Sequence, residues 1–293
     1  MASLPTLLRG PEIVLAAGVY DGLTASLAAA AGFQAIYLSG ASIAYTKLGR
    51  PDIGLVSMSE VADVIALIRD RVATPLIVDA DTGYGNALNV QRTVRLFERA
   101  GASAIQLEDQ TFPKRCGHLS DKSVIPAAEM VGKIKAAVDA RASEQTLVIA
   151  RTDAVAVEGF EPAIERARRY AEAGADVLFV EAPRSQDQLA AVVRAFPKGP
   201  PLMANMVEGG RTPILGREAL QALGFSLVIF PGGIVRAIAK TARAFYETLA
   251  RDGTTDAFRG SMFDFDELND VIGTPAMLEI GRRYEATAPK DKS

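Results

Sequence analysis

The chain has 293 residues, 49% of them hydrophobic, and its 32 basic residues nearly balance its 35 acidic residues. This balance and the absence of tryptophan argue against a nucleic-acid-binding surface or a basic membrane-binding face. No apolar run approaches the roughly 20 residues that span a bilayer. A single cysteine excludes an internal disulfide, which is typical of a reducing compartment. We therefore expect a cytoplasmic protein without nucleic-acid or membrane partners.

A recurring unit runs along the chain. At four places an alanine-rich helical segment ends in a glycine, and a short apolar run follows two or three residues later. A glycine just after a helix typically adopts the left-handed C-cap conformation. Apolar runs of four to six residues are typical of buried parallel strands. The pattern predicts alternating helices and parallel strands, with C-caps at Gly32, Gly101, Gly174 and Gly224.

Extending this pattern over the whole chain predicts eight strands. They begin near Ile13, Ala35, Leu76, Ala104, Leu147, Val177, Leu202 and Leu227. Helices are expected between them, for example over residues 59–71, 87–100, 127–141, 162–173 and 236–249. Eight such units in about 250 residues predict a (β/α)₈ TIM-type barrel, with a doubly wound open sheet as the alternative.

The C-terminal segment continues beyond the eighth unit. We expect residues 1–293 to form a single barrel domain, in which about residues 254–293 are a C-terminal helical extension. Its helices are predicted near residues 263–269 and 275–284. This extension would cap the barrel or pack against a neighbouring subunit.

Polar residues collect where the predicted strands end. In a barrel of this kind the carboxyl ends of the strands face the active site. Turn preferences explain Ser39 or Asn205, but they do not explain several carboxylates together. The strand ends therefore form a candidate site, made of Ser39, Asp79, Asp81, Glu108, Arg151, Asp153, Glu181 and Asn205.

Two of these carboxylates indicate a metal. Side chains alternate along a strand, so Asp79 and Asp81 can point to the same side. With Glu108 they form an all-oxygen site of the kind that Mg²⁺ prefers, in which the ion retains several waters. The single histidine and single cysteine argue against a zinc cage. We predict Mg²⁺, with Mn²⁺ as a substitute.

The only cysteine and the only histidine, Cys116 and His118, lie two positions apart. Lys114 and Arg115 precede the cysteine, and nearby cations lower a thiol pKa. Gly117 allows the loop to bend tightly. A lone cysteine is more often a small buried apolar residue, and a lone histidine is often structural. The strand-end carboxylates favour a reactive role here.

The chain resembles the isocitrate lyase and phosphoenolpyruvate mutase superfamily, in the lyase branch that includes 2-methylisocitrate lyase, 2,3-dimethylmalate lyase and petal death protein. The resemblance covers nearly the whole chain. It rests on Asp52 and on residues 37–40, 79–85, 108–110, 114–118, 151–153, 181–182 and 204–206. It implies a barrel whose eighth helix is exchanged between subunits, as a homo-oligomer arranged as a dimer of dimers.

The resemblance also implies roles for the site residues. The metal would lie near Asp52, Asp79, Asp81 and Glu108. The catalytic set would be Lys114, Arg115, Cys116, His118 and Glu181, with Cys116 as the proton donor on a mobile loop. The substrate would contact Tyr37, Ser39, Gly40, Ala41, Asp79, Gly117, Arg151 and Asn205.

Departures from the methylisocitrate lyase pattern bear on the substrate. Val207 stands where those enzymes tend to carry a hydroxyl residue near an extra carboxylate, Ala41 and Ser42 replace glycines, and residues 230–233 form a more open loop. We therefore expect Mg²⁺-dependent retro-aldol cleavage of a 2-hydroxy dicarboxylate, such as a substituted malate, to a 2-oxo acid and a monocarboxylic acid.

Four alternatives stay open. The first is 2-methylisocitrate lyase, which cleaves a tricarboxylate to pyruvate and succinate. Oxaloacetate decarboxylase and carboxyphosphonoenolpyruvate or another phosphonate mutase are the second and third, and the intact cysteine motif argues against both. The fourth is a non-catalytic barrel, against which the complete carboxylate set argues.

Overall fold

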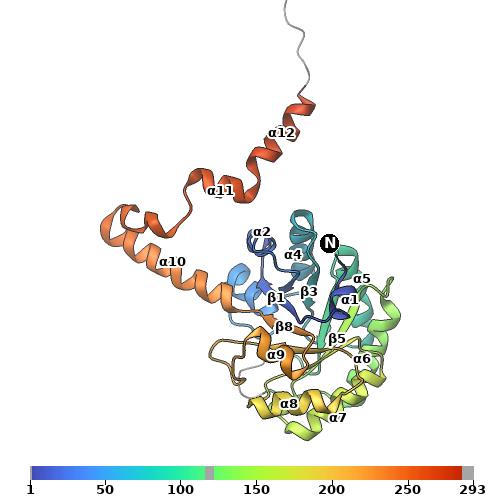
Figure 1. The fold of residues 1–293 in the computed structure, drawn as a ribbon. Coiled ribbons are helices and arrows are strands. Elements are labelled where there is room, and N and C mark those ends of the chain that lie inside the picture. Colours follow the sequence, from blue (N-terminus) through green and yellow to red (C-terminus); the bar gives the residue numbers. More distant parts are fainter. Residues whose placement is uncertain (1, 116–121, 286–293) are drawn as a thin grey trace, which may run out of the picture. The chain divides into compact units, whose positions relative to one another are not determined.

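A computed structural model of the chain describes residues 2–115 and 122–285 (Figure 1). The chain divides into two compact units, Met1–Arg236 and Ala237–Ser293. The first unit contains all the strands of the described residues and the helices around them. In the second unit the described residues form helices and the turns between them.

The described residues form a closed barrel of eight parallel strands, each paired with the next and the last with the first (Figure 1). This confirms the predicted barrel and rules out the open sheet. The strands begin at or within one residue of the predicted positions. They are β1 (Val14–Val19), β2 (Ala35–Leu38), β3 (Leu76–Asp79), β4 (Ala104–Glu108), β5 (Leu147–Thr152), β6 (Val177–Val180), β7 (Leu202–Asn205) and β8 (Leu227–Phe230).

One helix precedes the first strand, and the others connect the strands. They are α1 (Leu4–Leu8), α2 (Gly22–Ala30), α3 (Gly40–Ile43), the π-helical turn η1 (Ala44–Leu48), α4 (Met58–Arg71), α5 (Ala87–Ala100), α6 (Ala127–Ala140), the 3₁₀ turn η2 (Ala154–Ala156), α7 (Phe160–Glu172), α8 (Gln186–Ala195) and α9 (Arg217–Leu223). The four predicted C-cap glycines all adopt positive φ, between 85° and 107°. The local pattern that predicted the repeat is therefore present in the backbone.

The apolar core has two layers, as the barrel geometry requires. One layer fills the barrel and includes Tyr37, Ile77 and Phe179. Leu4 and Leu8 of α1 belong to this interior layer, together with residues that begin several strands, such as Val14 and Leu147. The other layer lies between the strands and the surrounding helices. Apolar side chains thus close the amino-terminal end of the barrel, and the polar residues collect at the other end.

The C-terminal helices follow β8. They are α10 (Gly233–Asp252), the 3₁₀ turn η3 (Asp256–Ser261), α11 (Phe265–Ile272) and α12 (Thr274–Tyr284). The last two agree with the helices predicted in the tail. Within the described residues, none of the helices is both long and apolar enough to cross a bilayer.

Candidate active site

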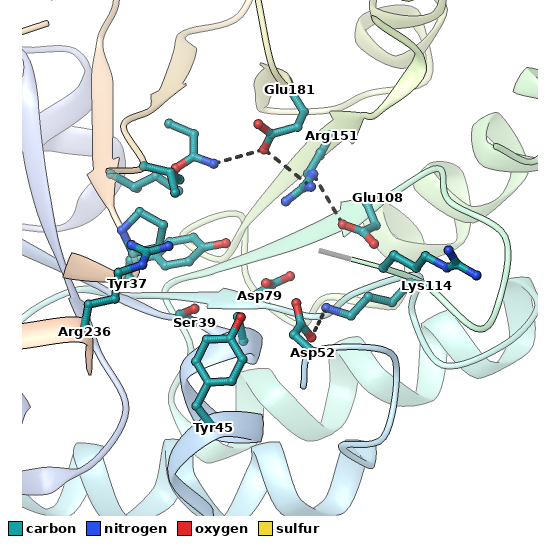
Figure 2. A pocket seen from close by; sticks show the side chains of 17 residues that line it. Tyr37, Ser39, Tyr45, Asp52, Asp79, Glu108, Lys114, Arg151, Glu181 and Arg236 are labelled. Atoms are coloured by element: carbon teal, nitrogen blue, oxygen red, sulfur yellow. Dashed lines mark hydrogen bonds and ion pairs between the residues drawn. The ribbon is translucent and has the colours of Figure 1, made fainter. Parts of the chain in front are cut away.

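A cavity of about 60 Å³ opens at the carboxyl ends of the strands (Figure 2). Most of the predicted site residues that the structure describes line it: Tyr37, Ser39, Ala41, Asp52, Asp79, Glu108, Lys114, Arg115, Arg151, Glu181 and Asn205. Gly40 and Asp81 lie beside it, since a Cβ on Gly40 would be 3.4 Å from Asp79 Oδ2 and 3.5 Å from Asp81 Oδ1. Cys116, Gly117 and His118 lie outside the described residues.

The exit of β3 brings two carboxylates together. Asp79 is the last residue of the strand, and Ala80 N donates a hydrogen bond to Gln106 O of β4. Asp81 then adopts a φ of 47°, and its backbone N–H donates to Asp79 Oδ1 at 3.2 Å. Positive φ is costly for a residue with a Cβ, and such strain is concentrated at functional sites. The tight turn keeps both carboxylates at the cavity.

We call Asp52, Asp79, Asp81 and Lys114 the acidic wall of the cavity. Lys114 Nζ lies 2.5 Å from Asp52 Oδ1 and 2.7 Å from Asp81 Oδ1, and all three side chains are buried. Burial raises the pKa of Asp81 to about 7, although the Lys114 ammonium opposes this shift. Burial would lower the pKa of Lys114, but the neighbouring carboxylates outweigh it and raise that pKa well above the usual range. One ammonium is therefore shared among more negative charge than it can neutralise.

A buried hydrogen-bond chain orients Asp79. Tyr37 OH donates to Gln106 Oε1 at 3.1 Å, and Gln106 Nε2 donates to Asp79 Oδ1 at 3.3 Å. Burial raises the pKa of Tyr37 well above its usual value, so its hydroxyl stays protonated and able to donate. Gln106 was not predicted from the sequence. Its only sequence signal is a polar residue inside an apolar strand.

We call Arg151, Asp153, Glu108, Glu181 and Asn205 the arginine wall. Arg151 donates to both carboxylate oxygens of Asp153, at 2.8 and 3.0 Å. Its guanidinium also lies 3.3 Å from Glu108 Oε2 and 3.4 Å from Glu181 Oε2. Asn205 Nδ2 donates to the same Glu181 oxygen at 3.0 Å, so one chain of contacts crosses four strands (Figure 2).

Charge pairing sets the protonation state of the arginine wall. Burial would raise the pKa of Asp153, but Arg151 and Lys122 outweigh it and lower the pKa below its usual value. Burial raises the pKa of Glu108 well above its usual value, and Arg151 only partly opposes that shift.

A ring contact also holds Arg151 in place. Its guanidinium lies 5.1 Å from the centre of the Phe179 ring, which adds a cation–π contact.

Six further residues line the cavity. Val207, Pro231 and Gly232 belong to the segments that the sequence linked to substrate choice, whereas Tyr45, Ile229 and Arg236 were not predicted. Arg236 donates to Glu208 Oε2 at 2.9 Å, and Figure 2 shows it across the cavity from Lys114. Neither Tyr45 nor Arg236 belongs to a strand end, so the strand-end pattern gave no reason to select them.

The donor set suits a hydrated divalent cation. Glu108 Oε1 is buried and has no hydrogen-bond partner among the described residues. Within those residues, no group of three or more Asp, Glu, His or Cys side chains is arranged to coordinate one metal ion directly. Mg²⁺ commonly uses one or two carboxylates and keeps several waters, so a loosely spaced set of carboxylates around a cavity fits its preference.

Comparison with known proteins identifies the family. The family model for phosphoenolpyruvate phosphomutase matches residues 4–250. The chain belongs to this family. The match spans every strand of the barrel and all of the described residues that line the cavity.

Named relatives cover almost the whole chain. A 2,3-dimethylmalate lyase from Eubacterium barkeri is 40% identical over 283 residues, which is 97% of each chain. A 2-methylisocitrate lyase from Aeropyrum pernix is 46% identical over 270 residues, covering 92% of this chain and 86% of the relative. These relatives confirm the resemblance noted in the sequence and the expected enzyme class, a carbon–carbon lyase.

Solved structures agree with the sequence relatives. An oxaloacetate acetylhydrolase bound to 3,3-difluorooxalacetate superposes with a TM-score of 0.91 at 36% identity, covering 96% of this chain and 95% of the other. A phosphonopyruvate hydrolase bound to oxalate and Mg²⁺ gives a TM-score of 0.86 at 33% identity, covering 96% and 97%. Because these named activities differ, the family by itself leaves the substrate open.

Proposed function

We propose that the chain cleaves a 2-hydroxy dicarboxylate of the substituted malate type by a retro-aldol reaction that requires Mg²⁺, with Mn²⁺ as a substitute. The products are a 2-oxo acid and a monocarboxylic acid. The observation that carries the proposal is the small cavity that lies between the carboxylates of the acidic wall and the buried Arg151. The lyase relatives support the reaction class, and the substrate is the finer part of the proposal.

The acidic wall is the proposed cation site. Its three carboxylates, Asp52, Asp79 and Asp81, would hold the ion together with Glu108 of the arginine wall, largely through waters. Bound there, the cation would supply positive charge that favours loss of the proton from the substrate's 2-hydroxyl group. The phosphonopyruvate hydrolase with oxalate and Mg²⁺ supports this cofactor for a site of this family.

The substrate's first carboxylate would lie at the backbone of Ser39, Gly40 and Ala41, near Tyr37 and Arg151. When the bond between C2 and C3 breaks, C2 becomes the carbonyl carbon of the 2-oxo acid, and the electron pair remains on C3 as an enolate. Arg151 and Arg115, which both line the cavity, would stabilise that charge. The small volume of the cavity limits the number of waters around the intermediate.

Protonation of the enolate carbon completes the monocarboxylic acid. We assign this step to Cys116, with Lys114 and Arg115 supplying nearby positive charge. Glu181 and Asn205 would orient His118 and hold the far end of the substrate. These roles follow from the family resemblance, since residues 116–118 lie outside the described part of the chain.

The far side of the cavity supports a second substrate carboxylate. Arg236 lies across the cavity from Lys114, and the Val207 side chain, which also lines the cavity, offers no hydrogen-bond donor. A dicarboxylate would place one carboxylate near Arg151 and the other toward Arg236. A third carboxylate would lack a partner at Val207, and an unpaired buried charge is costly.

We also propose that the barrel unit associates with a second copy of the chain. An apolar cavity of about 360 Å³ lies on the outside of the barrel, lined by Leu15 and Ala17 of β1, Phe230 of β8 and Phe33. These strand residues are only partly buried, although their neighbours Ala16 and Ile229 are fully buried. The eighth helix of another subunit would cover this surface, and sedimentation velocity would detect the resulting oligomer.

A substrate screen tests the proposed activity. The purified chain would be incubated with Mg²⁺ and malate, citramalate, 2,3-dimethylmalate, 2-methylisocitrate, isocitrate or oxaloacetate, and the 2-oxo acid would be measured. Excess chelator supplies the matched control. We expect the highest kcat/KM with a substituted malate, and no turnover when the chelator removes the metal. Preference for 2-methylisocitrate would make the chain a 2-methylisocitrate lyase, and full activity in chelator would contradict the cation site.

A further inference from the structure

A second cluster of buried polar groups lies behind the arginine wall. It is centred on Asp109, which directly follows β4 and is fully buried. Asp109 Oδ2 accepts hydrogen bonds from Thr152 Oγ1 at 2.7 Å and from Tyr170 OH at 2.7 Å. Arg166 Nη1 lies 3.3 Å from the same oxygen. We call Asp109, Thr152, Asp153, Arg166 and Tyr170 the Asp109 cluster.

The Asp109 cluster is connected to the site through the backbone of β5. Asp109 Oδ1 accepts a hydrogen bond from the backbone N–H of Asp153 at 2.9 Å. The side chain of Asp153 in turn accepts both guanidinium hydrogen bonds from Arg151. Asp109 therefore fixes the main chain at the residue whose carboxylate orients Arg151. It also follows Glu108 directly, so it holds the exits of β4 and β5 together.

The cost of this arrangement argues for a purpose beyond packing. A buried carboxylate is destabilising unless it is well paired, and apolar residues of similar size often replace buried ion pairs without loss of stability. Arg166 gives its two short bonds, of 2.6 and 2.7 Å, to Glu158, not to Asp109. Asp109 does not line the cavity, so it does not act on the substrate directly.

We propose that Asp109 is a positioning residue for the reaction, which acts through Asp153 to hold the guanidinium of Arg151 at the angle required by the substrate carboxylate and the enolate. Tyr170 and Arg166 hold Asp109 itself. The proposal rests on the proposed function, since it concerns the orientation of Arg151 within that site. Small displacements of a catalytic group are known to cost about 10²-fold in rate.

The opposite end of β5 offers a matched control. There Asp176 Oδ2 accepts a hydrogen bond from the backbone N–H of Val148 at 2.8 Å and from Arg141 Nη1 at 2.6 Å. Asp109 and Asp176 thus each link an arginine to a backbone N–H, that of Asp153 directly after β5 and that of Val148 near its start. Only Asp109 does so next to Arg151, because Val148 lies near the start of β5.

The experiment compares Asp109→Asn with Asp176→Asn and with a milder variant, Tyr170→Phe. Calorimetry measures oxalate affinity in the presence of Mg²⁺. Steady-state kinetics on the substrate with the highest kcat/KM in the screen give kcat and KM, and thermal unfolding gives Tm. We expect Asp109→Asn to weaken oxalate binding and lower kcat/KM about 10- to 100-fold. Tyr170→Phe removes one hydrogen bond and should lose about fivefold. Asp176→Asn should keep both quantities within twofold, whatever its Tm.

The outcomes separate the inference from the function on which it rests. Wild-type protein that binds no oxalate would overturn the proposed function and the inference with it. Wild-type binding together with unchanged binding in Asp109→Asn would overturn the inference alone, as would an equal loss in Asp176→Asn. If Asp109→Asn does not fold, Tyr170→Phe decides: a variant within twofold of wild type in both oxalate affinity and kcat/KM overturns the inference.

Discussion

The two walls of the cavity use the same residue types and balance their charges differently. In the acidic wall one ammonium, that of Lys114, is shared between Asp52 and Asp81, with Asp79 beside them. In the arginine wall Arg151 is held by Asp153 through two hydrogen bonds and contacts Glu108 and Glu181 as well. The first wall carries surplus negative charge, and the second presents a fixed cation.

Because of this difference, the acidic wall is suited to binding a cation and the arginine wall to stabilising an anion. A wall with surplus carboxylates attracts a further cation, because burial makes unneutralised negative charge unfavourable. A guanidinium held rigidly by a carboxylate retains its charge and direction while a substrate enters, which is the requirement for electrostatic stabilisation of a developing anion.

Removing a carboxylate from the acidic wall should have the largest effect. Asp81→Asn leaves Lys114 paired with Asp52 alone and reduces the negative charge offered to Mg²⁺. We expect at least a tenfold loss of Mg²⁺ affinity by calorimetry. Turnover should fall about 10³-fold, because the charge of a catalytic metal is worth several kcal/mol. The exposed Asp63 of α4 supplies the control, since Asp63→Asn should change neither value. Unchanged Mg²⁺ affinity in Asp81→Asn would contradict the proposed cation site.

Replacing the fixed cation of the arginine wall should have the next largest effect. In Arg151→Lys an ammonium keeps the charge but lacks the planar fork that binds both oxygens of Asp153. We expect kcat/KM to fall about 10²-fold, a loss typical for one misplaced stabilising donor. Steady-state kinetics measure it. Arg168→Lys on the exposed face of α7 is the matched control. A loss of less than threefold would mean that charge without orientation is sufficient.

A smaller effect is expected at the far side of the cavity. Val207→Thr adds a hydroxyl where a third substrate carboxylate would otherwise be unpaired. We expect the ratio of kcat/KM for 2-methylisocitrate to that for a substituted malate to rise about tenfold, since one hydrogen bond to a charged group is worth about 1.5 kcal/mol or more. Val207→Ala enlarges the space without adding a donor. An equal shift in both variants would show that volume, not hydrogen bonding, selects the substrate.

The smallest expected effect is on the pH dependence of the free energy of unfolding, which should reflect the raised pKa of Asp81 in the acidic wall. The pKa of Asp81 is raised from 3.8 to about 7 in the metal-free fold, so the folded state binds a proton that the unfolded state releases. Stability should therefore fall as pH rises from about 4 to 7, by roughly 1 kcal/mol per pH unit. Chemical denaturation in chelator at several pH values measures this slope. Asp81→Asn should remove this contribution and leave that of Glu108, whose raised pKa acts in the same direction. A slope that Asp81→Asn leaves unchanged would assign the titration to another group, such as Glu108.

Much of the fold follows from local sequence patterns. The four C-cap glycines and the apolar runs after them predict the strand positions, because helix termination and strand burial depend on residues that are close in sequence. The strand-end carboxylates could be predicted for a related reason. A parallel barrel brings the carboxyl ends of all its strands to one face, so their position in the chain is enough to place them near one another.

The pairing of these groups was decided by the tertiary structure. Lys114 lies between Asp52 and Asp81, Gln106 links Tyr37 to Asp79, and Arg236 reaches the cavity from α10. These contacts join residues on different strands, helices and loops, which no local periodicity relates.

The Asp109 cluster is the clearest case. Sequence alone identifies Glu108 and Asp109 as adjacent acidic residues at a strand end. Only the packing of α7 against β5 and β6, which brings Tyr170 to Asp109, decides that Glu108 lines the cavity while Asp109 is buried behind it. Successive side chains of a strand point to opposite faces, and what each of them meets there depends on elements far away in the chain.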